Sequence, residues 1–325
     1  MSGSGDVLKN DISLRQNMPV PGAGDIPVSE SIVTQEISRH LRTRQVGRVI
    51  RYFSTIDSTN LYGKQIAAEG AADGTLVIAD EQTAGKGRSG RHWVTPPKEA
   101  ISFTLILRTK LPPEKISRVT LVMGLAVAKA VYVLYRADKR SACNSLQGMK
   151  EENVLSEKNS DKALFGSDFG IKWPNDVVIN GKKLCGILTE MSAAHDKVND
   201  IVIGVGINAN LSRFPEEIAA TATSLKLELG REIDRARLIA AVMNEFEPLY
   251  AAFEETGSLA GMKDLYNNVC VNKDRPVRVL DPKGEYTGIA RGIDESGALL
   301  VERGDGTIRK VSSGEVSVRG IYGYV

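Results

Sequence analysis

Residues 80–93 read D-E-Q-T-A-G-K-G-R-S-G-R-H-W, directly after the apolar run at 76–79. That run predicts a buried strand. Behind it, three glycines alternate with three cations, and a tryptophan ends the segment. Glycine lets backbone amides approach a ligand closely, and lysine and arginine supply positive charge for a carboxylate or phosphate. The segment therefore predicts a site for an anionic small molecule beside a nucleotide.

Two well-known phosphate-binding loops do not account for this segment. The Walker A loop requires G-x-x-x-x-G-K-[ST], a spacing that does not occur here. Gly85, Gly87 and Gly90 match the spacing G-x-G-x-x-G, but Arg88 and Ser89 fill the intervening positions and no helical pattern follows. Taken alone, the segment leaves a second interpretation open, a basic glycine-rich surface hairpin.

A second polar segment, at 171–190, reads I-K-W-P-N-D-V-V-I-N-G-K-K-L-C-G-I-L-T-E. The runs at 177–179 and 184–188 predict two strands joined by a tight turn at Asn180 and Gly181. A third segment, at 200–210, reads D-I-V-I-G-V-G-I-N-A-N and predicts a strand that contains Gly204 and Gly206. Glycine inside a strand marks close approach of another group to the backbone.

Four motifs follow one another in a fixed order: D-S-T-N at 57–60, Q-T-A-G-K-G-R-S-G-R-H-W at 82–93, K-W-P-N-D at 172–176 with K-K-L-C-G-I-L at 182–188, and G-V-G-I-N at 204–208. In this order the chain resembles the biotin protein ligases, over about residues 31–325. The resemblance implies an α+β fold, with a mixed-sheet catalytic domain of the biotin/lipoate ligase type followed by a small SH3-like β-barrel. Asp57 comes too early for the winged helix of the repressor members, so we expect the form without that domain and no specific DNA binding.

The resemblance also implies which residues bind biotin, with Ser58, Thr59, Asn60 and Gln82 at the ureido ring. A simple helix cap at Ser58–Asn60 remains the alternative. Lys86 stands where many relatives have arginine, an exchange that matters little if the contact is made by backbone. The full expected set is Ser58, Thr59, Asn60, Gln82, Gly85, Lys86, Gly87, Arg88, Lys183, Gly186, Leu188 and Gly206.

For ATP, the resemblance places Trp93 by the adenine, with Asn208 hydrogen-bonding to the base and Arg91 at the phosphates. A core position for Trp93 and a structural role for Lys172 remain open alternatives. The full expected set is Arg91, Trp93, Lys172, Asn175, Asp176 and Asn208, with Asp176 also a candidate contact for Mg²⁺. The ion is expected to be held mainly by substrate phosphates.

The family reaction has two steps. Biotin and ATP give biotinyl-5′-AMP and pyrophosphate, and a lysine of a carboxylase carrier domain then takes the biotin and releases AMP. Such an enzyme needs no nucleophile of its own, only groups that hold two anions together and stabilise developing charge. Arg88 and Lys183 are the expected catalytic residues, with Lys182 as the alternative lysine. The expected partners are biotin, ATP with Mg²⁺ and the carrier domain, and no permanently bound cofactor is expected.

Composition excludes several other classes of protein. Lysine and arginine total 42 against 40 for aspartate and glutamate, a net charge of +2 that gives no bulk electrostatic case for nucleic acid. The scattered cysteines Cys143, Cys185 and Cys270 indicate reduced thiols in a cytoplasmic protein. No uninterrupted apolar run reaches the roughly 18 residues of a membrane span, so no membrane association is expected. A homodimer is left open.

The rest of the chain predicts the domain organisation. Residues 1–28 are polar and aperiodic and predict a flexible tail. Residues 29–271 form the expected catalytic domain, with helices at 113–136 and between Asp234 and Gly257 and a polar, mobile insertion at 137–168. Residues 272–325 contain five short strands separated by turns and predict the SH3-like domain.

Two alternative functions remain. Lipoate ligases share the fold and much of the pattern, but they usually lack K-W-P-N-D together with G-K-G-R-x-x-R-x-W. A biotin-sensing binding protein without transfer activity belongs to a different class. The presence of Arg88 and Lys183 argues against a sensor.

Overall fold

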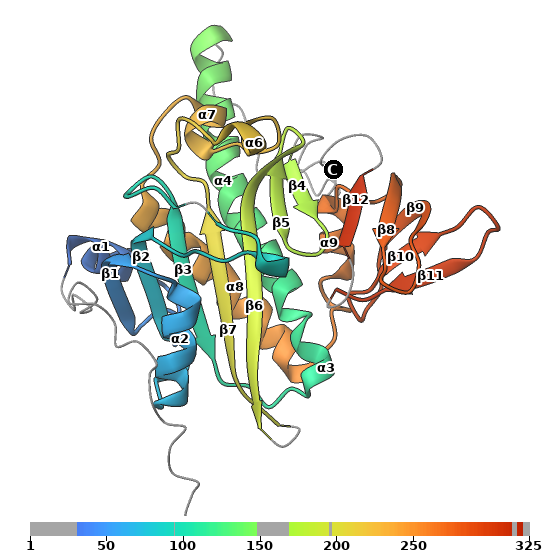
Figure 1. Ribbon diagram of the computed structural model, residues 1–325. Coiled ribbons are helices and arrows are strands. Elements are labelled where there is room, and N and C mark those ends of the chain that lie inside the picture. Colours follow the sequence, from blue (N-terminus) through green and yellow to red (C-terminus); the bar gives the residue numbers. More distant parts are fainter. Residues whose placement is uncertain (1–30, 94, 148–168, 195–196, 314–316, 321–325) are drawn as a thin grey trace, which may run out of the picture.

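The computed structural model describes residues 31–93, 95–147, 169–194, 197–313 and 317–320. The expected tail at 1–28 lies outside these residues. The described chain contains a seven-stranded sheet with helices on both faces and, beside it, a second sheet of five strands (Figure 1). This arrangement confirms the predicted α+β fold class.

The larger sheet has the strand order β1-β2-β3-β7-β6-β5-β4. β1 and β2 are parallel, and the other neighbours are antiparallel, so the sheet is mixed as expected. The strands are β1 (Ile50–Ile56), β2 (Leu76–Gln82), β3 (Ile101–Leu107), β4 (Phe169–Lys172), β5 (Asp176–Ile179), β6 (Lys182–Ala194) and β7 (Lys197–Ile207).

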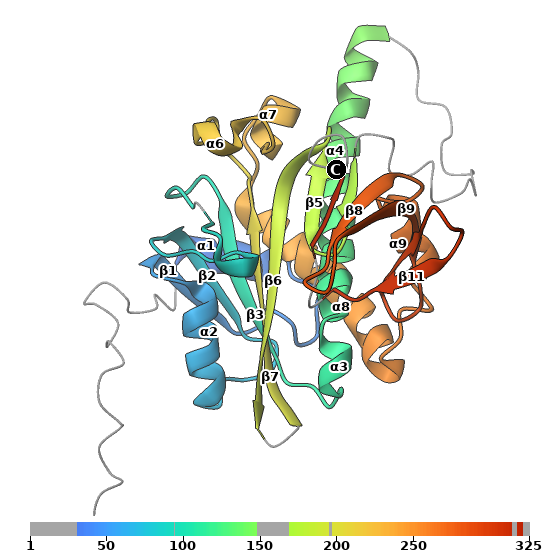
Figure 2. The same ribbon diagram turned by 45° about the vertical axis from the view of Figure 1, so that its right-hand side comes forward.

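The two faces of this sheet are covered differently. One face packs against the long helices α4 (Val119–Gln147) and α8 (Arg235–Thr256), where β7 contributes Ile203 and Val205 to the main core. The opposite face is covered in part by α2 (Thr59–Ala68), whose Tyr62 packs in the smaller core that contains Val202 (Figures 1 and 2). Because side chains alternate along a strand, Gly204 and Gly206 follow Val202 on this second face. On this face β7 therefore presents no side chains at positions 204 and 206, next to the first turn of α2.

Local signals explain the helix ends. Ser58 caps α2, since its side chain accepts from the backbone N–H of Leu61. Asp234 caps α8 in the same way, and Gly257 ends that helix in the left-handed conformation, as the sequence predicted. The remaining helices are α1 (Ile32–His40), α3 (Pro113–Ile116), α6 (Glu216–Ala219), α7 (Leu225–Leu229) and α9 (Lys263–Val269).

The expected helix at 113–136 differs from the observed one. A short helix, α3, precedes α4, and α4 continues to Gln147, so residues 137–147 of the expected insertion are helical. Residues 148–168 lie outside the described part of the chain. By length and composition alone the stretch at 113–136 could cross a bilayer, although no uninterrupted apolar run in the sequence reaches that length. Most of its apolar window is buried within the protein, as in a core helix.

The smaller sheet has the order β11-β10-β9-β8-β12. In it β8 pairs with both β9 and β12. The strands are β8 (Pro276–Leu280), β9 (Tyr286–Ile293), β10 (Leu299–Glu302), β11 (Ile308–Val311) and β12 (Ser317–Gly320). The two sheets are joined by contacts as well as by chain. The indole Nε1 of the buried Trp173 donates to the carbonyl of Gly297, at 3.1 Å. The domain boundary at 271/272 stays a prediction.

Candidate active site

A cavity of about 430 Å³ opens over the glycine-bearing face of β7. Its floor is made by neighbouring strands, because Gly206 pairs with Gly186 of β6 and Gly204 pairs with Leu188. The floor is backbone at these glycines, because glycine has no side chain. A methyl group on Gly204 would lie 2.2 Å from the Asn60 side chain, and one on Gly206 would lie 2.2 Å from the Trp93 ring. The glycines thus leave the space that these two side chains occupy.

One end of the cavity is lined by uncharged polar side chains, which bond one another and the Glu190 carboxylate behind them. The amide of Asn60 donates to the carboxylate of Glu190 at 2.9 Å. The backbone N–H and the hydroxyl of Thr59 both donate to Oε1 of Gln82, at 2.9 and 3.0 Å. These groups present donors and acceptors in fixed positions, as recognition of a small polar ring requires.

The other end carries positive charge around a single carboxylate. The ammonium of Lys183 lies 2.8 Å from Oδ1 of Asp176. Burial lowers the pKa of Lys172 to about 8, an effect that Asp176 opposes and that Lys183, Arg319 and Arg91 strengthen. Burial, together with Arg91, also lowers the pKa of Arg88, again against Asp176. Several positive charges near a single carboxylate favour the binding of an anion.

Arg88 and Arg91 lie on the glycine-rich segment, which closes on itself. The backbone N–H of Gly87 donates to the carbonyl of Arg91 at 2.7 Å, and that of Trp93 donates to the carbonyl of Gly85 at 2.9 Å. The Arg88 guanidinium donates to Oδ1 of Asn175 at 3.0 Å and to the carbonyl of Ser313 at 2.8 Å. Through Ser313 the segment contacts the C-terminal domain.

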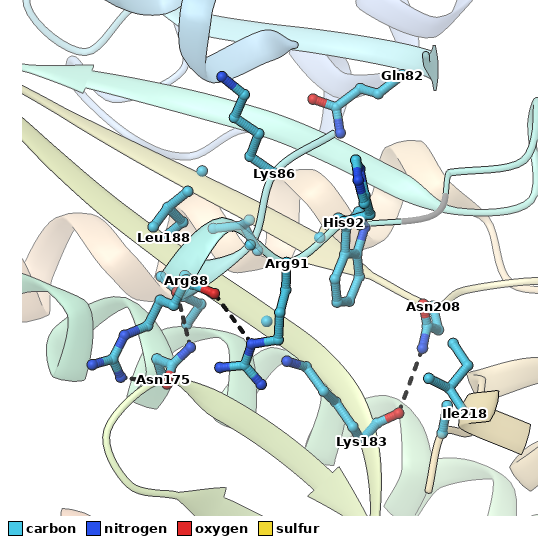
Figure 3. A pocket seen from close by; sticks show the side chains of 18 of the residues that line it. Gln82, Lys86, Arg88, Arg91, His92, Asn175, Lys183, Leu188, Asn208 and Ile218 are labelled. Atoms are coloured by element: carbon cyan, nitrogen blue, oxygen red, sulfur yellow. Dashed lines mark hydrogen bonds between the residues drawn. The ribbon is translucent and has the colours of Figure 1, made fainter. Parts of the chain in front are cut away.

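Arg91 donates through Nε to the carbonyl of Arg88, at 3.1 Å. Figure 3 shows its guanidinium and the Lys183 ammonium directed into the same part of the pocket. Trp93 lies across Gly206 and Gly186, with the Lys183 ammonium 5.4 Å from its ring centroid. Its indole Nε1 is buried and has no hydrogen-bond partner among the described residues.

A β-bulge decides which of the two adjacent lysines enters the cavity. Strict alternation would place Lys182, and not Lys183, on the same face of β6 as Gly186. In the pairing with β5, however, Val177 faces Cys185 while Val178 faces Lys183, so β6 carries one extra residue. Lys183 therefore lines the cavity, 3.1 Å from the position of a methyl group on Gly186, whereas Lys182 is exposed.

Asn208 lies at the end of β7 beside a loop that returns over the pocket. Its Nδ2 donates to the carbonyl of Thr223 at 3.0 Å. The backbone of Lys183 pairs with the same loop, because its N–H donates to Thr221 at 2.7 Å and its carbonyl accepts from Thr223 at 2.9 Å. This loop and α6 supply Ile218 at the pocket edge (Figure 3).

The structure brings nearly all expected site residues together around this one cavity. Three of them do not line it: Gly85, Lys172 and Asp176. Gly85 is required by the loop itself, since a methyl group there would lie 2.6 Å from the carbonyl of Trp93. Lys172 and Asp176 are buried beside the charged end. The lining members are Ser58, Thr59, Asn60, Gln82, Lys86, Gly87, Arg88, Arg91, Trp93, Asn175, Lys183, Gly186, Leu188, Gly206 and Asn208.

Sequence reasoning missed a second group of lining residues. They come mainly from the segment after Asn208, which has no periodicity and no charge pattern to mark it. The only available signal was its position directly behind the G-x-G-x-N strand, at the edge where that strand ends. The missed residues are His92, Pro96, Phe103, Ile187, Gly204, Val205, Leu211, Arg213, Phe214, Pro215, Ile218, Thr221 and Ala222.

Comparison with known proteins settles the family. Residues 52–208 match the biotin/lipoate A/B protein ligase family, and residues 274–319 match the biotin protein ligase C-terminal domain. The bifunctional ligase/repressor BirA of Bacillus subtilis is 34% identical over 285 residues, which cover 87% of this chain and 78% of that protein. The chain belongs to the biotin protein ligase family.

Two further proteins are similar to most of this chain. The biotin–[acetyl-CoA-carboxylase] ligase of Mycobacterium tuberculosis is 31% identical and is matched over 86% of this chain and 94% of its own length. Among solved structures, the biotin protein ligase from Aquifex aeolicus in complex with biotin and ATP is similar with a TM-score of 0.63 and 26% identity. That match covers 84% of this chain and 99% of the Aquifex chain.

Proposed function

We propose that this protein is an ATP-dependent biotin–protein ligase, a biotin–[biotin carboxyl-carrier protein] ligase. It forms biotinyl-5′-AMP from biotin and ATP and transfers biotin to a lysine of a carboxylase carrier domain. The observation that carries this proposal is the division of one cavity into an uncharged polar end at Thr59, Asn60 and Gln82 and a cationic end at Lys183. Biotin has the same division, with a ureido ring at one end and a carboxylate at the other.

The cationic end supports adenylate formation. The Lys183 ammonium and the Arg88 guanidinium are placed to draw the biotin carboxylate and the α-phosphate together and to stabilise charge on the phosphate oxygens. Before the substrates arrive, the ion pair with Asp176 holds the Lys183 ammonium in position. When the anion binds, the ammonium leaves Asp176 for it. Trp93 and Asn208 remain the groups proposed for the adenine.

A magnesium ion is proposed as the companion of ATP. Among the described residues no group of three histidine, cysteine or acidic side chains is placed to hold a metal. Asp176 is a single carboxylate beside the charged end, which fits an ion held mainly by phosphates and water. When bound, the ion would neutralise phosphate charge. Lys183 and Arg88 would position the reacting groups.

The polar end favours biotin over lipoate as the substrate. The dithiolane ring of lipoate offers no N–H groups, so it could not use the acceptor capacity that Asn60 and Thr59 retain beyond their bonds within the protein. We further propose a cytoplasmic location, supported by the scattered cysteines, of which Cys185 and Cys270 are buried free thiols.

The test is incubation with labelled biotin, ATP and a carboxylase carrier domain. Transfer of label to the carrier lysine is the expected result, with release of pyrophosphate and AMP. Adenylate that forms without transfer would indicate a sensor, and transfer of lipoate alone would indicate the other ligase class. A Lys183→Ala variant is the matched control for non-enzymatic labelling.

A further inference from the structure

Thr104 of β3 is a completely buried hydroxyl residue beneath the polar end of the cavity, and it does not line the cavity itself. It pairs across the sheet with Gly204. Its Oγ1 lies 2.6 Å from Oδ1 of Asn60 and 2.9 Å from Oγ1 of Thr59, and its one hydroxyl proton is shared between these two acceptor oxygens. One hydroxyl on the sheet thus contacts two consecutive residues of α2 that do line the cavity.

The orientation of the Asn60 amide follows from its neighbours. Its Nδ2 lies 2.9 Å from Oε2 of Glu190 and 3.3 Å from the carbonyl of Leu188. A carboxylate and a carbonyl can only accept, so the NH₂ group must face them. The carbonyl oxygen of the amide is then directed at Thr104, the group that donates to it.

The Asn60 amide packs directly on the floor of the cavity. A methyl group on Gly204 would lie 2.2 Å from Oδ1 of Asn60, so the amide rests directly on the glycine backbone. Thr59 is fixed by the same hydroxyl and by Gln82. After these bonds, Oδ1 of Asn60 and Oγ1 of Thr59 each retain acceptor capacity.

A ureido ring carries two N–H donors and one carbonyl, so its site must present acceptors at fixed places. We propose that Thr104 is a positioning residue for biotin recognition, which acts by fixing the acceptor oxygens of Asn60 and Thr59 from beneath, with Glu190 fixing the other end of the Asn60 amide. The inference rests on the proposed function and adds two residues to its specificity. Thr104 acts through Asn60 and Thr59 and does not contact the substrate.

The first test compares Thr104→Val with Thr104→Ser. Valine keeps the shape and removes the donor, whereas serine keeps the donor. For Thr104→Val we expect the KM for biotin in adenylate formation to rise about tenfold, as for the loss of one hydrogen bond to a binding group. The KM for ATP and kcat at saturating biotin stay near their original values, and Thr104→Ser restores the KM for biotin.

A matched control is Thr120→Val. Thr120 is a nearly buried threonine of α4 whose hydroxyl bonds that of Thr189 at 2.8 Å, away from the cavity lining. The Thr120→Val variant loses the same kind of bond, and we expect its KM for biotin to stay unchanged. An unchanged KM for biotin in Thr104→Val would overturn the proposal. Equal losses for biotin and ATP with a lowered melting temperature, as a structural role gives, would also overturn it.

A second variant decides the matter if Thr104→Val does not fold. Glu190→Gln replaces an acceptor-only group by one that can also donate, so the Asn60 amide loses one of the two acceptors that fix its orientation. We expect a rise of several-fold in the KM for biotin. Lys64→Gln is its control, because it removes only the partly exposed ion pair of Lys64 with Glu190. Equal effects of the two variants would contradict the proposal. Biotin transfer by the unmutated protein is measured first, so a failure of the proposed function is recognised separately.

Discussion

The ammonium of Lys183 lies 2.8 Å from the Asp176 carboxylate, at the point where β5 and β6 run side by side. The pair is only partly exposed, and the buried Lys172 and the half-buried Arg88 lie near the same carboxylate. One acidic group thus holds the Lys183 ammonium and offsets part of the charge of the cations around it.

Lys183→Ala should stop adenylate formation while leaving the fold intact. The variant loses an amine that stabilises charge developing on phosphate, and the rate of pyrophosphate release should fall by about 10²-fold or more. Lys182→Ala is the matched control, since that lysine is exposed and does not line the cavity. Near-normal pyrophosphate release in Lys183→Ala would show that another group performs this role.

Gly206→Ala should impair ligand binding, because the new methyl group would lie 2.2–2.6 Å from three atoms of the Trp93 ring. The indole must then move away from the strand, and we expect the affinity for ATP and biotin to fall roughly tenfold or more. Gly261→Ala is the control, since no atom lies within 4 Å of its added methyl group. Isothermal calorimetry with each ligand measures the effect. Unchanged affinities in Gly206→Ala would show that the indole does not need this close approach.

Lys172 should make the stability of the unliganded protein depend on pH. Its folded pKa of about 8 lies below the unfolded value of about 10.4, so between these values the unfolded chain binds more protons. The free energy of unfolding should therefore gain a contribution, at most about 3 kcal/mol, as the pH rises through this window, and should lack it below pH 8.

Lys172→Met removes the buried charge, so it should remove this rise and stabilise the unliganded protein at pH 7. Urea unfolding of both proteins from pH 7 to 10 measures the difference. Lys182→Met controls for loss of a lysine elsewhere in the same sheet, since its side chain is exposed. A constant difference between Lys172→Met and the original protein across this range would contradict the pKa assignment.

Arg88→Ala should loosen the contact between the glycine-rich segment and the C-terminal domain. The variant loses the bonds to Asn175 and to the carbonyl of Ser313. Amides at 308–313 should exchange faster with solvent, in addition to a loss of adenylation. Arg91→Ala is the comparison, because the hydrogen bond from Arg91 to the carbonyl of Arg88 stays within the segment. Equal exchange at 308–313 in the two variants would show that Arg88 does not couple the parts.

The sequence predicted the fold class and most of the cavity lining, because the motifs place glycines and cations at strand ends where a pocket can form. The tight turn, the helix caps and the order of the two sheets are local or family-wide signals of this kind. The long helix α4 shows the limit of such reasoning. Polarity after residue 136 suggested an irregular insertion, yet helical hydrogen bonds continue to Gln147 without an apolar stripe to mark them.

Other features of the site depend on the tertiary structure. Alternation along β6 would place Lys182 beside Gly186, and only the extra residue opposite β5 brings Lys183 there, because one bulge reverses every later side-chain direction. Thr104 and the segment after Asn208 carry no motif, and they meet the site only when the sheet and its loops are assembled. The sequence by itself determined which residue types the site contains. The pairing of distant strands decided which of them meet, because contacts across a sheet depend on register and not on distance along the chain.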